Sequence, residues 1–322
     1  MTVLITGGCG LVGSNVARVL AQKGTNCILL DKKTHLWDFL EPLGDRIRML
    51  NGDVYDFENL FEIARKNKVE GIIHLAAVKY EKDCKTNPLN AYNINCSSTL
   101  NVLEIARRLN MRRVLFASSG AVFGEWKDRN ASIREEDTPT LRGLYPTMKR
   151  VSELMLEGFR RVYSLDFASF RISRVYGPGV IHAEPESHPV RTIAYKCVYE
   201  GKVEEPSGLD FAGDFSFVED VADGIGGLYT ADKLSYSLYH LGGGILYQVT
   251  DIVKILKEIF PDVSIAVGPG DQPYAGQAPI RGPLCIERAK NEIGYEVKYS
   301  LSDGIKKYAA WLSLQKNKRS QE

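Results

Sequence analysis

Thr6-Gly7-Gly8-Cys9-Gly10-Leu11-Val12-Gly13 is a glycine-rich segment between two regular patterns. Residues 2–6 form a short apolar run typical of a buried strand, and residues 11–23 repeat apolar side chains at helical spacing. Glycines at a strand-to-helix turn let backbone N–H groups approach a pyrophosphate, and the helix N-terminus adds partial positive charge. The glycines alone would also fit a plain turn. In this context they predict a dinucleotide loop with cofactor contacts at Gly7, Gly10, Leu11, Val12 and Gly13.

The next predicted strand, residues 27–31, ends in an acidic residue, Asp31, which lies 18 residues after Gly13. A carboxylate at this place accepts hydrogen bonds from both ribose hydroxyls of an adenosine and repels a 2′-phosphate. Lys32 and Lys33 follow it, but no arginine does. The sequence therefore predicts NAD rather than NADP as the cofactor.

The first half of the chain alternates short apolar runs with longer helical patterns, which is typical of βαβ units and a parallel sheet. After about residue 176 the pattern changes, because Gly, Pro and His cluster in residues 177–189 and shorter mixed segments follow. We expect an α/β fold, a Rossmann-type doubly wound parallel sheet with a smaller C-terminal substrate-binding lobe. The predicted strands are 2–6, 27–31, 47–51, 71–76, 113–118 and 166–172, and the predicted helices are 11–23, 57–67, 91–110 and 147–163. The NAD-binding domain is placed at 1–176 with returning segments at about 212–240, and the lobe at 177–211 and 241–322.

Composition narrows the class of protein. The 322 residues are 44% hydrophobic and 25% charged, which is ordinary for a folded soluble chain. Lys and Arg number 41 against 40 Asp and Glu, so the net charge of +1 gives no field for nucleic acid or an acidic membrane. No apolar run approaches the roughly 18 residues of a transmembrane helix, and the first predicted strand begins at residue 2. Six cysteines without a C-x-x-C pair are expected to be reduced thiols, in a cytoplasmic protein without a metal site.

Tyr145 and Lys149 lie four residues apart, on one face of a predicted helix. A tyrosine can act as general acid or base at a carbinol, and a nearby ammonium favours its phenolate form. Lys149 is expected to supply that charge and to contact the nicotinamide ribose. Tyr229 and Lys233 have the same spacing, so the spacing alone does not identify the pair.

Position in the predicted sheet favours the first pair. Upstream of Tyr145, the strand 113–118 runs into Ser118-Ser119-Gly120, and strand ends of such a sheet carry the chemistry of the fold. A serine hydroxyl there could orient a substrate. Without the Tyr–Lys pair, the two serines would be explained as a strand-end turn.

In this order, the glycine loop, Asp31, the strand-end serines and Tyr145-x-x-x-Lys149 resemble the extended short-chain dehydrogenase/reductase family, which contains NAD-dependent sugar epimerases and dehydratases. The resemblance covers nearly the whole chain. It implies hydride transfer between C4 of nicotinamide and a substrate carbon bearing oxygen, with Ser119, or as second choice Ser118, as the catalytic hydroxyl. Besides Tyr145 and Lys149, the further cofactor-binding residues it implies are Asp53, Val54, Leu75, Ala76, Ala77, Lys79 and Asn95.

Later segments also resemble this family. Residues 171–179 look like its entry into the substrate lobe, residues 214–222 like its second crossing to the sheet, and residues 281–301 like its C-terminal signature. The resemblance implies a homodimer formed by the helices near 91–110 and 147–163. The substrate-binding residues expected are Ser119, Arg174 and Arg281.

Two departures from the family pattern narrow the reaction. Dehydratases of the family carry an acidic pair just after the catalytic hydroxyl, where this chain has Gly120 and Ala121. The 3,5-epimerases carry a cysteine at the place of Ala121. Dehydration and 3,5-epimerisation are therefore disfavoured, although His182 or His188 could serve as another base.

Two more departures concern the substrate's anionic group. Nucleotide-sugar epimerases place an arginine where this chain has Gly213, and an asparagine where it has Arg174. Arg174 suits a carboxylate or phosphate, although a structural ion pair would also explain it. Arg191 or Arg281 could replace the missing phosphate contact.

Three functions stay open at this point. The first is an NAD-dependent oxidoreductase acting on a free or acidic sugar-like substrate, and the second is a nucleotide-sugar 4-epimerase, such as one for UDP-sugars, that keeps its NAD tightly bound. The third is a non-catalytic NAD-sensing module, against which the intact Ser119, Tyr145 and Lys149 argue.

Overall fold

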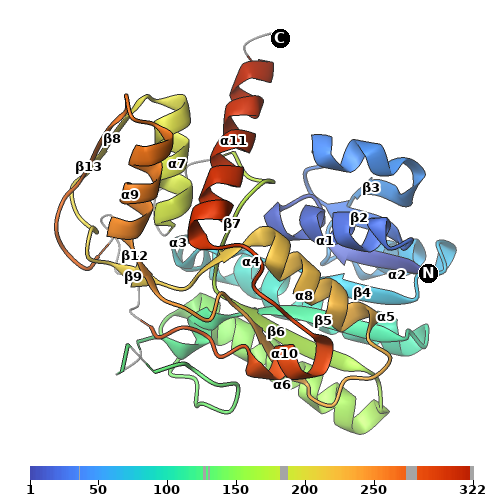
Figure 1. Cartoon of the computed structure of the whole chain (residues 1–322). Helices are drawn as coiled ribbons and strands as arrows, with labels where there is room; N and C mark the ends of the chain where they lie inside the picture. Colours follow the sequence, from blue (N-terminus) through green and yellow to red (C-terminus); the bar gives the residue numbers. More distant parts are fainter. Residues whose placement is uncertain (36, 126–127, 130, 182–187, 273–280, 320–322) are drawn as a thin grey trace.

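The computed structural model describes residues 1–35, 37–125, 128–129, 131–181, 188–272 and 281–319. Its centre is a seven-stranded parallel sheet in the order β11-β6-β5-β4-β1-β2-β3 (Figure 1). The strands are β1 (Thr2–Thr6), β2 (Asn26–Asp31), β3 (Ile47–Asn51), β4 (Gly71–His74), β5 (Arg113–Ser119), β6 (Phe167–Ile172) and β11 (Leu238–Leu241). The chain order reverses between β1 and β4, which creates the crevice where such sheets bind ligands. The predicted Rossmann-type sheet is confirmed.

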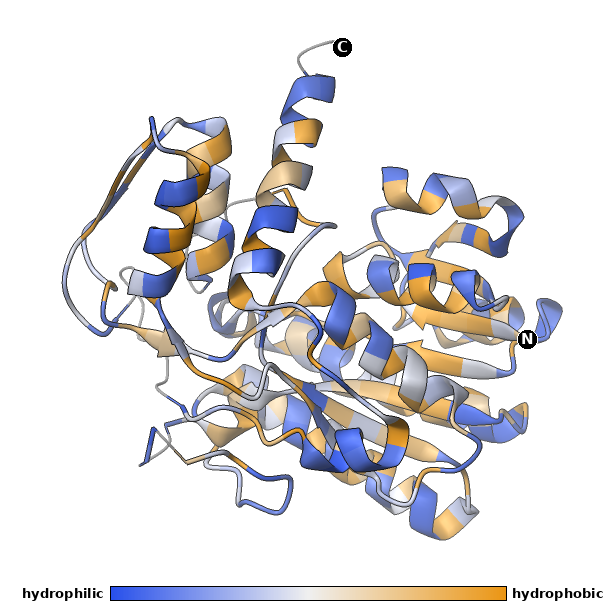
Figure 2. Ribbon diagram, in the orientation of Figure 1, coloured by the Kyte–Doolittle hydropathy of each residue, from blue (hydrophilic) through white to orange (hydrophobic). Residues whose placement is uncertain are grey.

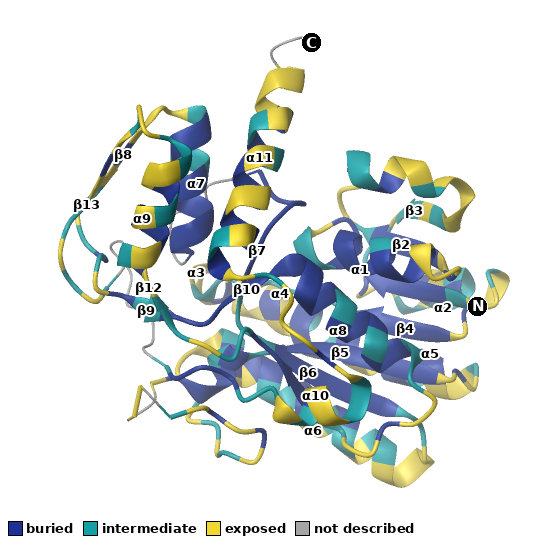
Figure 3. Ribbon diagram, viewed as in Figure 1, coloured by how far each residue is buried: buried dark blue, intermediate teal, exposed yellow. Residues whose placement is uncertain are grey.

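Helices cover both faces of the sheet because alternate strand residues point to opposite sides. Val3 and Ile5 of β1 pack with α1 (Leu11–Gln22) and α8 (Val218–Thr230). Leu4, between them, packs in a second core with α2 (Phe57–Lys66), α5 (Ser98–Arg108) and α6 (Leu144–Tyr163). The central strands are therefore mostly apolar on both faces, which Figure 2 shows as hydrophobic colour and Figure 3 as burial, whereas the edge strand β3 has no buried residue.

The helix predicted at residues 91–110 is divided in the structure. It consists of α4 (Pro88–Tyr92), a π-helical turn (Asn93–Ser97) and α5. Such a turn inserts a wider loop into a helix and is frequent at functional sites. The turn contains Asn95, whose side chain binds a neighbouring segment.

The smaller lobe has its own apolar core. Its main elements are α7 (Pro189–Tyr199), β8 (Lys202–Glu205), α9 (Val249–Ile259), β13 (Ser264–Val267) and α11 (Leu301–Arg319). Two short strand pairs connect it to the sheet, β7 (Arg174–Tyr176) with β10 (Phe215–Phe217), and β9 (Ala212–Gly213) with β12 (Tyr247–Gln248). Figure 1 shows the lobe above the carboxyl ends of the strands, so it covers the crevice.

One segment assigned to the lobe packs elsewhere. In α10 (Glu287–Ile293), Ala289 is buried in the same core as α1 and α8, and Tyr295 just after the helix joins it. Its Tyr295 hydroxyl donates to the Gly242 carbonyl beside β11, at 2.9 Å. We propose that residues 287–295 belong to the sheet half.

All six cysteines are free thiols, and five are buried. Within the described ranges, no helix has the length and apolar character needed to cross a membrane. Remaining short helices are α3 (Glu81–Thr86) and the 3₁₀ segments Asp38–Arg46 and Gly120–Phe123.

Candidate active site

A cavity of about 1350 Å³ follows the carboxyl ends of the central strands and continues under the lobe. The glycine loop lines one part of it, and Arg174, Arg191 and Arg281 line another. Fifteen of the residues predicted from sequence line it: Gly7, Gly10, Leu11, Val12, Gly13, Asp31, Val54, Leu75, Ala76, Ala77, Lys79, Ser119, Tyr145, Arg174 and Arg281. Asp53, Asn95 and Lys149 are not among the lining residues.

The glycine loop has the geometry of an anion cradle. Gly7 has φ +65°, and a Cβ there would lie 2.9 Å from the Ala76 backbone nitrogen. A Cβ on Gly13 would lie 2.4 Å from the Gly7 carbonyl oxygen. The N-cap of α1, Gly10, has no side chain, and the first turn has no acidic residue, so the helix N-terminus stays open to a phosphate. These residues fit NAD.

Asp31 ends β2 at the same cavity. Its Oδ2 accepts a hydrogen bond from the Cys9 backbone N–H at 3.2 Å, which joins the carboxylate to the glycine loop. Lys32 Nζ lies 2.9 Å from Asp53 Oδ2. Asp53 is therefore held in an exposed ion pair with Lys32, while its neighbour Val54 lines the cavity.

Asn95 acts through another residue. It is 1% exposed, and its Oδ1 accepts from the Val78 N–H at 2.9 Å while its Nδ2 donates to the Val78 carbonyl at 3.0 Å. Both backbone groups of Val78 are thus satisfied by one side chain. Asn95 fixes the segment after β4, residues 75–79, that lines the cavity.

The two strand-end serines have different surroundings. Ser118 is buried and donates a hydrogen bond to Glu153. Glu153 also accepts two hydrogen bonds from Arg171, at 2.8 and 2.9 Å. Ser119 lines the cavity, its Oγ accepts from the Ala121 N–H at 3.1 Å, and it hydrogen-bonds Tyr145.

Tyr145 and Lys149 lie in one buried group. Burial raises the pKa of Tyr145 to about 12, while the hydrogen bond with Ser119 and the charge of Arg281 act in the opposite direction. Burial lowers the pKa of Lys149 to about 8. Lys149 Nζ donates to the Ala117 carbonyl at 2.7 Å and lies 5.8 Å from the centroid of the Tyr145 ring. The Lys149 ammonium therefore lies close to the Tyr145 ring, and Lys149 is not among the residues that line the cavity.

Positive side chains gather beyond Tyr145. Arg174 stacks on Phe211, with its guanidinium carbon 4.7 Å from the ring centroid. A Cβ on Gly213 would lie 3.3 Å from Arg174 Cδ, so Arg174 occupies space that a side chain at 213 would need. Burial lowers the pKa of Arg174 to about 10, with the charge of Asp214 opposing it.

Arg281 completes this end of the cavity. Burial and the positive charge of Arg174 lower its pKa to about 9. The Nε atoms of Arg174 and Arg281 are buried and have no hydrogen-bond partner among the described residues. Lys79 and Arg191 line the same region, and burial and the Arg191 charge lower the pKa of Lys79 to about 8. The arrangement suits an anion.

His188 and His182 are the two histidines considered as an additional base. His188 lines the cavity beside Arg174, packs against the Tyr176 and Phe215 rings, and has its pKa lowered to about 3 by burial. Its ring is therefore uncharged at neutral pH. His182 lies outside the described residues.

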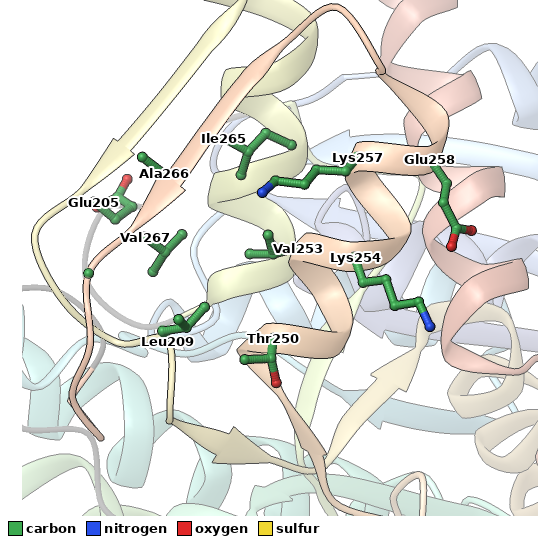
Figure 4. Close-up of a pocket in the computed structure, with 11 residues that line it drawn as sticks. Glu205, Leu209, Thr250, Val253, Lys254, Lys257, Glu258, Ile265, Ala266 and Val267 are labelled. Atoms are coloured by element: carbon green, nitrogen blue, oxygen red, sulfur yellow. The ribbon is translucent and has the colours of Figure 1, made fainter.

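A second cavity of about 830 Å³ lies in the lobe, between α9 and the β8–β13 pair (Figure 4). Its lining combines aliphatic side chains, including Leu209, Val253 and Ile265, with the charged residues Glu205, Lys254, Lys257 and Glu258. None of the site residues predicted from sequence lines it, so the chemistry belongs to the larger cavity.

The comparison with known families agrees with this geometry. Residues 3–242 match the model described as the NAD dependent epimerase/dehydratase family. The chain belongs to this family. As an epimerase/dehydratase family member, the protein is an NAD-dependent enzyme, and the resemblance seen in the sequence is confirmed.

Relatives within the epimerase/dehydratase family act on sugar nucleotides by name. UDP-glucuronate 4-epimerase 4 of Arabidopsis thaliana is 27% identical over 342 residues, covering 97% of this chain and 75% of that protein. UDP-glucose 4-epimerase of Yersinia enterocolitica is 25% identical over 351 residues, covering 98% and 99%. The crystal structure of UDP-glucose 4-epimerase from Thermotoga maritima with UDP-glucose has a TM-score of 0.84 at 25% identity, with full coverage of both chains.

The sequence pattern does not predict the buried hydrogen-bond network of Ser118, Glu153 and Arg171. Arg171 and Glu153 are 18 residues apart on a strand and a helix, and the network depends on how these elements pack. No local pattern marks it. Its effect is to hold Ser118 away from the cavity and leave Ser119 facing it.

Proposed function

We propose that the protein is a nucleotide-sugar 4-epimerase that acts on an acidic sugar. The observation that carries this proposal is one cavity in which an anion-binding glycine loop, the Ser119–Tyr145 pair and the arginines Arg174 and Arg281 follow one another. A cofactor, a reacting carbinol and a negatively charged substrate group fit along it in that order. The names of the relatives support the sugar-nucleotide class.

In the proposed mechanism, Tyr145 Oη takes the proton of the carbinol hydroxyl, and Ser119 Oγ hydrogen-bonds the same oxygen. The glycine loop and Asp31 would hold NAD, which would supply a hydride acceptor, and in its reduced form a hydride donor, for the carbinol carbon. The loss of a proton from Tyr145 requires positive charge nearby, because burial raises its pKa to about 12. Arg281 supplies positive charge that lowers the pKa of Tyr145, and Lys149 Nζ lies 5.8 Å from the centroid of its ring.

The positive residues make an acidic substrate the best fit. Arg174, Arg191, Arg281 and Lys79 line this end of the cavity. Asp214 faces Arg174, but its carboxylate also accepts hydrogen bonds from the Gly243 and Leu284 N–H groups, at 2.7 and 3.1 Å. The buried Nε atoms of Arg174 and Arg281, which have no hydrogen-bond partner among the described residues, suit a diphosphate or a sugar carboxylate.

The first measurement is to denature freshly purified protein and quantify released NAD and NADH per chain. A 4-epimerase oxidises and reduces within one cycle, so we expect close to one equivalent. UDP-glucuronate is then supplied without added cofactor, and its 4-epimer is measured by chromatography. UDP-glucose is the matched neutral substrate.

The alternative is a net dehydrogenase of a free sugar acid, which the glycine at position 213 favours because it removes a phosphate contact of nucleotide-sugar epimerases. This enzyme would be purified without cofactor and would release one NADH for each substrate oxidised. Such stoichiometric release would replace the epimerase proposal with the dehydrogenase.

We infer a homodimer formed through α5 and α6, in the cytoplasm. Large apolar side chains are exposed on these helices: Leu100 (45% exposed), Leu154 (51%), Val162 (72%) and Tyr163 (46%). Exposed apolar residues that gather on neighbouring helices favour a protein interface. The six free thiols support a reducing compartment.

A further inference from the structure

The helix that carries Tyr145 is capped by a carboxylate from another part of the chain. Glu81 Oε1 accepts a hydrogen bond from the Leu144 N–H at 3.0 Å, and Glu81 Oε2 accepts one from the Tyr145 N–H, also at 3.0 Å. Glu81 is the first residue of α3 and lines the large cavity. One side chain thus binds the backbone of the catalytic tyrosine and of the residue before it.

The first turn of α6 has little else to satisfy its donors. Its N-cap, Gly143, has no side chain, the turn has no acidic residue, and Pro146 has no N–H. Glu81 therefore satisfies two consecutive backbone N–H groups, those of Leu144 and Tyr145. A carboxylate at a helix N-terminus also interacts favourably with the helix dipole.

The backbone at Gly143 fits this contact. Its φ is +107°, and a Cβ there would lie 2.6–2.7 Å from the carboxylate atoms of Glu81. Any larger residue would push the carboxylate away. The contact of Glu81 with α6 therefore requires a glycine at position 143.

Glu81 also links two parts of the active site. It directly follows residues 75–80, which line the cavity and whose Val78 is held by Asn95. The same carboxylate that ends this segment fixes the start of α6. The two hydrogen bonds of 3.0 Å therefore fix Tyr145 relative to residues 75–80.

We propose that Glu81 is a positioning residue, whose carboxylate holds the first turn of α6 so that Tyr145 Oη lies in register with the cofactor and Ser119. The proposal rests on the proposed role of Tyr145. A displacement of about 1 Å at a reacting group can cost about 100-fold in rate.

The test compares Glu81→Ala with Asp83→Ala, which removes an exposed carboxylate of the same short helix. Both enzymes are purified with their own cofactor and given UDP-glucuronate. We expect Glu81→Ala to lower kcat about 10- to 100-fold, with KM and NAD content within about twofold of the wild type. Asp83→Ala keeps the wild-type kcat.

Glu81→Gln separates positioning from folding. The amide keeps one acceptor oxygen for one N–H group but turns its NH₂ toward the other, so its kcat lies between those of the wild type and Glu81→Ala. This variant preserves the size of the side chain. It therefore tests the proposal even if Glu81→Ala does not fold.

Amide hydrogen exchange gives a readout without substrate. Peptides that contain Leu144 and Tyr145 exchange faster in Glu81→Ala and Glu81→Gln than in the wild type, and unchanged in Asp83→Ala. A merely stabilising role would instead speed exchange throughout the sheet half.

Two results would overturn the proposal: kcat and exchange unchanged in both Glu81 variants, or a loss of kcat that only follows the loss of folded, NAD-containing protein. Tyr145→Phe measured alongside separates the two proposals. If the wild type does not turn over UDP-glucuronate, or Tyr145→Phe does so at the wild-type rate, the proposed function fails, and the exchange data still decide whether Glu81 holds α6.

Discussion

Burial and nearby positive charge have opposite effects on the pKa of the Tyr145 phenol. Burial raises its pKa to about 12, and the hydrogen bond with Ser119 and the charge of Arg281 partly oppose the shift. General acid–base catalysis of this kind is worth about 100- to 10,000-fold in rate. We expect Tyr145→Phe to lose at least about 100-fold in kcat while keeping the wild-type NAD content after denaturation. A variant with near-normal turnover would contradict the assignment.

Lys149 makes the stability of the cofactor-free protein depend on pH. Its pKa is lowered from 10.5 to about 8 by burial, so the unfolded chain binds more protons than the folded one between these values. Stability contributed through this group therefore rises with pH from about 8 to 10.5. Urea unfolding across this range should show the rise, and Lys149→Met should remove it. An identical pH profile in the variant would contradict the shift.

Arg174 carries the prediction about substrate charge. Its guanidinium, stacked on Phe211, has a buried Nε without a described partner, which suits an anionic ligand. Arg174→Ala should raise KM for UDP-glucuronate at least about tenfold, since a lost charge-assisted hydrogen bond costs about 1.5–3 kcal/mol. KM for UDP-glucose serves as the comparison. An equal increase for both sugars would place the contact at the shared diphosphate rather than at a sugar carboxylate.

Between elements, the π-helical turn before α5 connects the helix layer to the cofactor segment. Asn95→Ala would remove the partner of the part-buried Val78 N–H and would leave the Val78 carbonyl with only the weak Cys84 thiol donor. The expected loss is about 2 kcal/mol of unfolding free energy, together with weaker NAD retention and faster exchange of residues 75–80. Thr99→Ala, which removes one hydroxyl bonded within the same helical region, is the control. NAD retention equal to that of the control would contradict the role of Asn95 in holding the segment 75–80.

The elements also show which features the sequence could reveal. The glycine loop, Asp31 and the Tyr145–Lys149 spacing are local patterns, and short apolar runs predict the central strands. The resemblance to the family adds other residues of the cavity lining, among them Val54, Leu75 and Arg281. Glu81 and Leu144 are 63 residues apart, and their contact exists only after α3 packs on α6. The π-helical turn was missed for the same kind of reason, because the bond from Asn95 to Val78 is tertiary. Helical periodicity alone predicts an unbroken helix there.

For the whole molecule, the exposed apolar residues of α5 and α6 predict an assembly. Leu154 is 51% exposed in the middle of α6. Leu154→Arg would place a charge in the inferred interface and should give a monomer in analytical ultracentrifugation, while Leu314→Arg on α11, which is 60% exposed, should not. A wild-type monomer, or a dimer in Leu154→Arg, would contradict the proposed interface.

The late seventh strand has a consequence for synthesis on the ribosome. β11 pairs with β6, with Leu238 opposite Ser169, and α8 packs on α1. While the intervening residues are translated, at about 5–20 per second, β6 is an open sheet edge for several seconds. The apolar face of α1 waits about three times as long for its partner, because α1 ends at Gln22 and α8 begins only at Val218. A nascent chain halted near residue 176 would therefore expose the edge of β6 and the apolar face of α1, and would depend on chaperones. A chain halted after residue 241 has emerged would have both surfaces covered.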